Sequence, residues 1–240
     1  MRKIIIFSYD GSKFYGLQRQ KKLRSVQKEI EDALTKVFCE EIVIKASGRT
    51  DAGVHAINQV AHFDCYTDIK DLKKKLNEIL MPDIVVKKVK NVCNDFHARK
   101  SVEKKEYIYK INLGPFKSSL NDYYYQPRNK LDISLMKDAA KVFIGTHDFK
   151  NFISGDNDKT ITTIYSITFN KKIDKKLEIS FIGTGFYRYM VRNLVGALIE
   201  VGKYKTSKDT LNDMLDTIEN KKSLPTAPPE GLYLSKVWYK

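Results

Sequence analysis

The stretch Ser47-Gly-Arg-Thr-Asp-Ala-Gly-Val-His55 lies between two apolar segments that we predict to be strands. Gly48 and Gly53 flank its charged centre, and glycine permits backbone angles and close approaches that a side chain would block. A loop of this composition can hold Asp51 in a fixed position with Arg49 beside it. A tight turn with a surface Arg–Asp pair is the alternative, although loops between strands often carry functional residues.

One carboxylate in this loop restricts the chemistry. Glycoside hydrolysis ordinarily uses two acidic residues, and the loop contains only Asp51. No paired spacing of Asp and Glu elsewhere indicates a two-metal nuclease site. A single carboxylate suffices when the base never leaves, as in the conversion of uridine to pseudouridine, which needs no water, redox partner or metal.

Hydrophobic periodicity around this loop predicts an α+β fold with a largely antiparallel sheet and helices on one face. The first half does not alternate strands and helices regularly, and neither does the second. We place a subdomain boundary at Gly114-Pro115, giving residues 1–113, which carry the Asp51 loop, and residues 114–240. The expected strands are residues 4–9, 42–46, 59–64, 84–89, 104–113, 161–169, 177–182 and 232–239, and the expected helices are 25–37, 70–80, 131–143, 186–201 and 207–220.

The composition indicates a polyanionic partner. The 240 residues include 43 Lys and Arg against 29 Asp and Glu, a formal net charge of +14, which favours binding to nucleic acid over binding to a small neutral ligand. No apolar run approaches the roughly 20 residues of a spanning helix. The three cysteines and four histidines have no metal-ligand spacing. We therefore expect a cytoplasmic protein with no metal, cofactor or membrane partner.

Five motifs in order resemble the TruA family of tRNA pseudouridine synthases. The first is Tyr9-Asp-Gly-Ser-Lys-Phe-Tyr-Gly-Leu-Gln-Arg-Gln20, followed by Ser25-Val-Gln27, and the second is Gly48 to His55. The third is Asp95-Phe-His-Ala-Arg99 with Tyr107-x-Tyr109, and the fourth is Phe186 to Gly196. The fifth is Thr226-Ala-Pro-Pro-Glu-Gly-Leu-Tyr-Leu234. The resemblance covers nearly the whole chain.

The resemblance implies roles for four residues. Asp51 is the catalytic nucleophile, acting at the ribose or at the base, and Tyr107 packs against the target uracil. Arg192 pairs with the aspartate, and Arg49 helps displace the target base. The residues agree with these roles, because a flipped base needs stacking and an arginine within an apolar helix needs an acidic partner. Without the family, the sequence favours core or cross-strand packing for Tyr107 over contact with a base.

The resemblance also implies a pseudouridine synthase fold of two similar subdomains with a joined, mainly antiparallel sheet and a central cleft. It implies a homodimer that acts on tRNA, not DNA, at uridines 38, 39 and 40 of the anticodon stem-loop. The chain departs from the family pattern at Leu17, where tryptophan is usual, and at Thr162, where arginine is usual. These departures leave open the same isomerisation on ribosomal RNA. A catalytically silent RNA-binding protein that kept the fold is a second alternative, although the presence of Asp51, Tyr107 and Arg192 together favours the enzyme.

Overall fold

The computed structural model describes residues 1–155, 159–217 and 224–240. The chain forms two compact units, one of residues 1–103 with 233–240 and the other of residues 104–232. The sequence placed a subdomain boundary at Gly114-Pro115 instead. That boundary follows the order of the chain, whereas the first unit also takes in residues 233–240, of which Tyr233 and Leu234 pair with His55 and Ala56.

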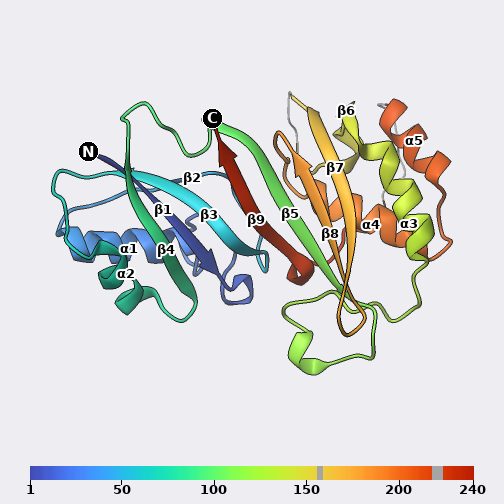
Figure 1. Cartoon of the computed structure of the whole chain (residues 1–240), viewed down its shortest axis with the longest axis horizontal. Coiled ribbons are helices and arrows are strands. Elements are labelled where there is room, and N and C mark those ends of the chain that lie inside the picture. Colours follow the sequence, from blue (N-terminus) through green and yellow to red (C-terminus); the bar gives the residue numbers. More distant parts are fainter. Residues whose placement is uncertain (156–158, 218–223) are drawn as a thin grey trace. The chain divides into compact units, whose positions relative to one another are not determined.

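The first unit is a sheet with two helices. Its strands are β1 (Arg2–Tyr9), β2 (Lys45–Ala46), β3 (His55–Asp64), β4 (Ile84–Val92) and β9 (Leu232–Tyr239). They lie in the order β4-β1-β3-β9, with β2 also paired to β3 (Figure 1). All these pairs are antiparallel except β3 with β9, in which His55 lies opposite Tyr233.

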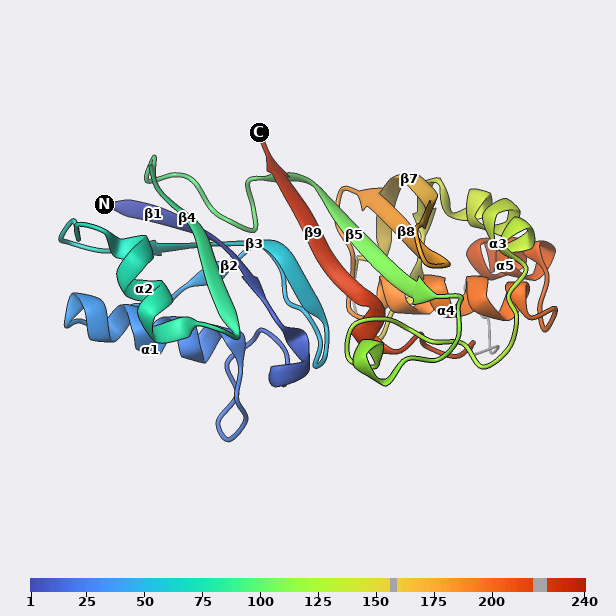
Figure 2. The ribbon, with the colours of Figure 1, turned by 60° about the horizontal axis from the view of Figure 1, so that its bottom comes forward.

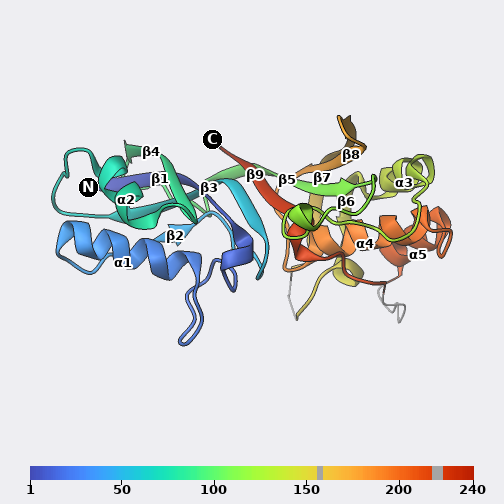
Figure 3. The same ribbon diagram turned by 90° about the horizontal axis from the view of Figure 1, so that it is seen from below.

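Helices α1 (Val26–Phe38) and α2 (Leu72–Leu80) cover one face of this sheet (Figure 3). The apolar residues of α1 recur at helical spacing, so that Val26, Ile30 and Leu34 are fully buried. The α2 helix buries Leu72, Leu76 and Leu80 in the same way. The core of the first unit therefore lies between these two helices and the inward side chains of β1 and β3.

The second unit has the same kinds of element. Its strands are β5 (Val102–Asn112), β6 (Gly145–Asp148), β7 (Ile161–Lys172) and β8 (Lys176–Gly183), and its helices are α3 (Ile133–Ala139), α4 (Met190–Gly202) and α5 (Lys208–Asp216). The strand order is β5-β8-β7-β6, with every pair antiparallel. The prediction of an α+β fold with mainly antiparallel sheets is confirmed.

Several predicted elements differ in extent. The expected helix at 186–201 begins only at Met190, because Tyr189 has a left-handed φ of 61° that no helix residue adopts. The strand expected at 42–46 is reduced to Lys45–Ala46, and β6 was not predicted. Of the helix expected at 207–220, residues 208–216 are helical, and residues 218–220 lie outside the described residues. Among the described residues, no helix has the length and apolar composition needed to cross a membrane.

Candidate active site

The Asp51 loop connects β2 to β3 and is tied to β3 at its start. The Ser47 amide donates to the carbonyl of Val60 at 2.7 Å. The Ser47 hydroxyl donates to Oε1 of Gln59 at 2.6 Å, and Nε2 of Gln59 donates to the carbonyl of Gly48 at 3.1 Å. Ser47 and Gln59 are fully buried. The first two residues of the loop are therefore held by a side chain that the sheet itself fixes.

Thr50, next to Asp51, is held from two sides. Its hydroxyl lies 2.7 Å from the hydroxyl of Tyr9, and its carbonyl accepts the Leu17 amide at 3.1 Å. Tyr9 and Thr50 are 5% and 8% exposed, so this hydrogen bond is shielded from water. Burial raises the pKa of Tyr9 to about 12, although its hydrogen bonds to Thr50 and Gln59 act in the opposite direction. The phenol therefore stays protonated at neutral pH.

Two glycines let the opening motif pack against the loop. A Cβ atom on Gly11 would lie 2.2 Å from the carbonyl oxygen of Val54, and a Cβ on Gly16 would lie 2.8 Å from that of Thr50. Gly16 also has a φ of +92°, which disfavours any side chain. The glycines at these two positions are thus required by the close approach of two segments far apart in the sequence.

His55 anchors the end of the loop. Its Nδ1 accepts the Gly11 amide at 2.9 Å, and its ring stacks on Tyr233 with centroids 4.5 Å apart and an interplanar angle of 14°. His55 is 2% exposed. The loop is thus fixed at both ends, while Asp51 itself is half-buried and Arg49 is exposed.

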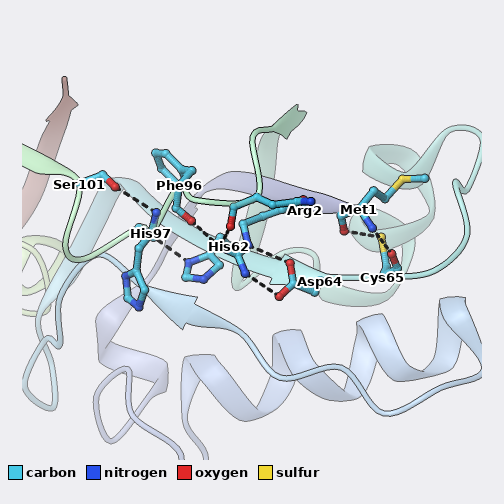
Figure 4. Close-up of polar contacts among 10 residues, drawn as sticks. Met1, Arg2, His62, Asp64, Cys65, Phe96, His97 and Ser101 are labelled. Carbon is cyan, nitrogen blue, oxygen red and sulfur yellow. Dashed lines mark hydrogen bonds and ion pairs between the residues drawn. The ribbon is translucent and has the colours of Figure 1, made fainter.

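The motif Asp95-Phe-His-Ala-Arg99 closes the same unit (Figure 4). The Ala98 amide donates to Nδ1 of His62 at 3.1 Å, and Arg2 donates to the Phe96 carbonyl at 2.9 Å while also pairing with Asp64. Burial, reinforced by the neighbouring His97, lowers the pKa of His62 to about 4. His62 is therefore neutral at physiological pH and can accept this hydrogen bond. The contacts of this motif are structural.

In the second unit, Tyr107 lies on β5 and is 7% exposed. Phe186 packs edge-to-face against its ring, with centroids 5.3 Å apart and an interplanar angle of 81°. Such a contact fixes the ring plane and contributes about 0.5–1.5 kcal/mol beyond area burial. Two motifs separated by nearly eighty residues therefore meet at this aromatic pair.

Arg192 lies in the first turn of α4 and is held by the closing motif. Its Nε donates to the Ala227 carbonyl at 2.8 Å, and the Ala227 amide donates to the Arg192 carbonyl at 3.0 Å. The guanidinium also lies 4.9 Å from the centroid of the Tyr189 ring, a favourable cation–π distance. The orientation of the guanidinium is thus set by a carbonyl and a ring.

The closing motif approaches α4 closely at one further point. A Cβ on Gly196 would lie 1.8 Å from the Pro225 carbonyl oxygen, and the Thr226 hydroxyl donates to Oδ1 of Asn193 at 2.7 Å. Glu230, in the same motif, is half-buried. Burial raises the pKa of its carboxyl, although the charge of Arg192 favours the ionised form.

The structure thus places Arg49 and Asp51 on one loop of the first unit, and Tyr107 and Arg192 in the second unit. The supporting contacts of Tyr9 with Thr50 and of Tyr189 with Arg192 were not predicted. The motifs contained these residues, but no local pattern indicates that Tyr9 meets Thr50 across 41 positions. Within the described residues, no group of three His, Cys, Asp or Glu side chains is arranged to hold a metal.

Leu17 and Thr162, where the chain departs from the family pattern, both fill structural roles. Leu17 is 3% exposed, and its amide bonds the loop at Thr50. The Thr162 hydroxyl donates to the Gly185 carbonyl at 3.0 Å and lies 3.0 Å from the Thr184 hydroxyl. These contacts account for the two residues within the fold, and the alternative of a ribosomal RNA substrate stays a prediction.

The family comparison agrees with this arrangement. The sequence profile described as tRNA pseudouridine synthase matches residues 5–99 and 139–240, which include the Asp51 loop and α4. The chain belongs to the tRNA pseudouridine synthase family. It is accordingly an enzyme of RNA modification, an isomerase that converts uridine to pseudouridine.

Individual relatives extend the match over nearly the whole chain. The chain is 42% identical to tRNA pseudouridine synthase A of Geobacillus sp. (strain WCH70), covering 97% of this chain and 96% of that protein. It is 44% identical to the Listeria monocytogenes serotype 4b protein of the same name, covering 98% and 97%. A chain of a solved Cbf5-Nop10-Gar1 complex is 13% identical with a TM-score of 0.36, and the match spans 83% of this chain but under half, 45%, of that chain.

Proposed function

We propose that the protein isomerises uridines 38, 39 and 40 in the anticodon stem-loop of tRNA, with Asp51 as the nucleophile. The observation that carries this proposal is how the Asp51 loop is held. The residues on both sides of the half-buried Asp51 carboxylate are hydrogen-bonded to the sheet or to the opening motif. A catalytic group must be held close to its productive geometry, since small displacements reduce the rate strongly.

The reaction rearranges bonds within one nucleotide. The bond between N1 of uracil and C1′ of ribose breaks, the uracil turns, and a bond forms between C5 and C1′. C5 then loses a proton while N1 ends with one, so that the product is an isomer of the substrate. Attack of Asp51 at C1′ and attack at the base both fit this rearrangement. Each route regenerates the carboxylate at the end of the cycle.

Three further residues have proposed roles. Tyr107 stacks against the flipped uracil, and its ring is supported for this by Phe186. Stacking on an aromatic ring is worth about 1–3 kcal/mol per base. Arg192 pairs with the Asp51 carboxylate and keeps it ionised, and the contacts with Ala227 and Tyr189 favour a fixed guanidinium. Arg49, exposed on the same loop as Asp51, helps displace the base from its stack.

We also propose that the enzyme is a homodimer that binds one tRNA across both subunits, in the cytoplasm. Residues 166–172 of β7 pair with β8 on one side, and among the described residues no strand pairs with their other side. Tyr165, just beyond the part of β7 that pairs with β6, is 51% exposed. An open strand edge next to an exposed aromatic residue is suited to an interface. A light-scattering mass of twice 27.8 kDa would support the dimer.

The test of the proposed function is Asp51→Asn, which keeps the shape of the side chain but removes its charge. We expect no pseudouridine in a tRNA transcript under single-turnover conditions, with the dissociation constant for the same transcript changed by less than about threefold. Asp32→Asn, which removes a surface carboxylate on α1, should leave the rate unchanged. Substantial turnover by the Asp51 variant would refute the assignment, and mapping positions 38 to 40 tests the substrate.

A further inference from the structure

The segment Gln18–Arg24, which leads into α1, is strongly basic. It contains Arg19, Lys21, Lys22 and Arg24, and all seven of its residues are exposed. In Figures 2 and 3 this dark-blue loop extends away from the sheet of its own unit. The four positive charges of this loop would repel one another unless acidic side chains or a bound partner compensated them.

The two arginines of the loop are already paired inside the unit. Arg19 donates to Oε2 of Glu31 at 3.0 Å, and the Glu31 side chain is only 4% exposed. Arg24 donates to Asp83 at 2.7 Å and lies 4.6 Å from the centroid of the Phe14 ring. These contacts compensate both charges and order the two ends of the loop.

Backbone contacts fix the loop base as well. The Tyr15 amide donates to the Arg24 carbonyl at 2.9 Å, and the Arg19 amide donates to Oε1 of Gln27 at 3.1 Å. The tip, however, carries two lysines that have no hydrogen bond or ion pair in the part of the chain that the structure describes. The loop therefore presents Lys21 and Lys22 on an ordered support.

The loop begins beside the candidate active site. The Leu17 amide bonds the carbonyl of Thr50, the residue before Asp51. Lys22 is five residues from Leu17, so its Cα lies within about 18 Å of that hydrogen bond even if the chain is fully extended. At about 3.4 Å per stacked nucleotide, this reach corresponds to about five nucleotides.

We propose that Lys21 and Lys22 bind the RNA backbone within about five nucleotides of the target uridine, while Arg19 and Arg24 order the loop. This rests on the proposed function, since it takes Asp51 to mark the position of the target. Lysine ammonium groups neutralise phosphates without reading the base. The loop thus supplies affinity next to the reacting nucleotide without restricting which neighbouring bases are accepted.

The test compares Lys21→Gln/Lys22→Gln with Lys73→Gln/Lys74→Gln, a pair of exposed lysines on α2 in the same unit. The probe is a fluorescein-labelled 17-nucleotide anticodon stem-loop, titrated from 50 to 200 mM KCl. Each phosphate contact contributes about 0.7–0.9 to the slope of log affinity against log salt. Losing two contacts should make the slope shallower by about 1.6. The wild type therefore binds more tightly than the loop variant at 50 mM, and this advantage is about ninefold smaller at 200 mM.

The expected kinetic result is a raised KM with an unchanged kcat for the loop variant. The α2 variant should keep the wild-type slope and KM, since Lys73 and Lys74 lie on a helix outside the proposed contact. An unchanged slope and KM in the loop variant would overturn the proposal, as would an equal loss in the α2 variant. The wild-type enzyme is assayed first on the full tRNA: absence of product there would instead refute the proposed function.

Discussion

The hydrogen bond between Tyr9 and Thr50 gives the sharpest prediction about how the Asp51 loop is held. Tyr9→Phe keeps the ring but leaves the Thr50 hydroxyl without its 2.7 Å partner in a site that is less than a tenth exposed. A buried polar group left unsatisfied costs about 1–3 kcal/mol. If about 1.4 kcal/mol of this cost falls on the catalytic geometry, kcat decreases about tenfold.

The complementary variant, Thr50→Val, should be milder. The Tyr9 hydroxyl also interacts with Gln59 and so keeps one partner. The double variant removes both hydroxyls, and we expect it to lose no more than Tyr9→Phe alone, a coupling of about 1 kcal/mol. Hydrogen exchange of the Leu17 amide, which bonds Thr50, reports the order of the loop directly.

Two measurements test whether the Tyr9–Thr50 hydrogen bond supports catalysis. Single-turnover rates on tRNA should fall for Tyr9→Phe with little change in KM, and the Leu17 amide should exchange about tenfold faster. Tyr204→Phe, which removes an exposed hydroxyl bonded to Asp132 in the other unit, is the control and should match wild type. A Tyr9→Phe rate within twofold of wild type, despite faster exchange at Leu17, would show that the hydrogen bond only stabilises the fold.

Two other predictions concern the packing around the site. The pKa of His62 is lowered to about 4, so the unfolded chain binds a proton below about pH 6.5 that the folded one does not, and unfolding free energy should fall between pH 6.5 and 4. The full shift would be worth about 3 kcal/mol of unfolding free energy, and with screening of the surface charges around His62 we expect a decrease of about 1–2 kcal/mol. Urea titrations of the wild type at several pH values should show this decrease, and His62→Asn should not. Gly196→Ala brings a methyl group against the Pro225 carbonyl, so it should displace the segment that holds Arg192 and reduce kcat at least tenfold. Gly185→Ala, with no atom within 4 Å of the new Cβ, should have wild-type kinetics, and equal activity of the two alanine variants would contradict the packing argument.

Helices and strands were predicted correctly from the sequence where apolar residues recur at a regular spacing. The stretches that became α1, β1 and β5 have apolar residues at the spacing of a helix or a strand, and their faces are buried as expected. The start of α4 did not follow, because the left-handed conformation of Tyr189 is imposed by its surroundings and tyrosine has no preference for it. Similarly, β6 has four polar or small residues and exists because β7 pairs with it.

The sequence by itself determined the family, the α+β class and the candidate residues, because motifs and periodicity are properties of neighbouring positions. Tertiary structure alone decided what holds those residues. It pairs Tyr9 with Thr50, Gly11 with His55, and Ala227 with Arg192. Such contacts depend on where the chain returns in space, and a hydroxyl or a carbonyl in the sequence carries no mark of the partner that it will meet.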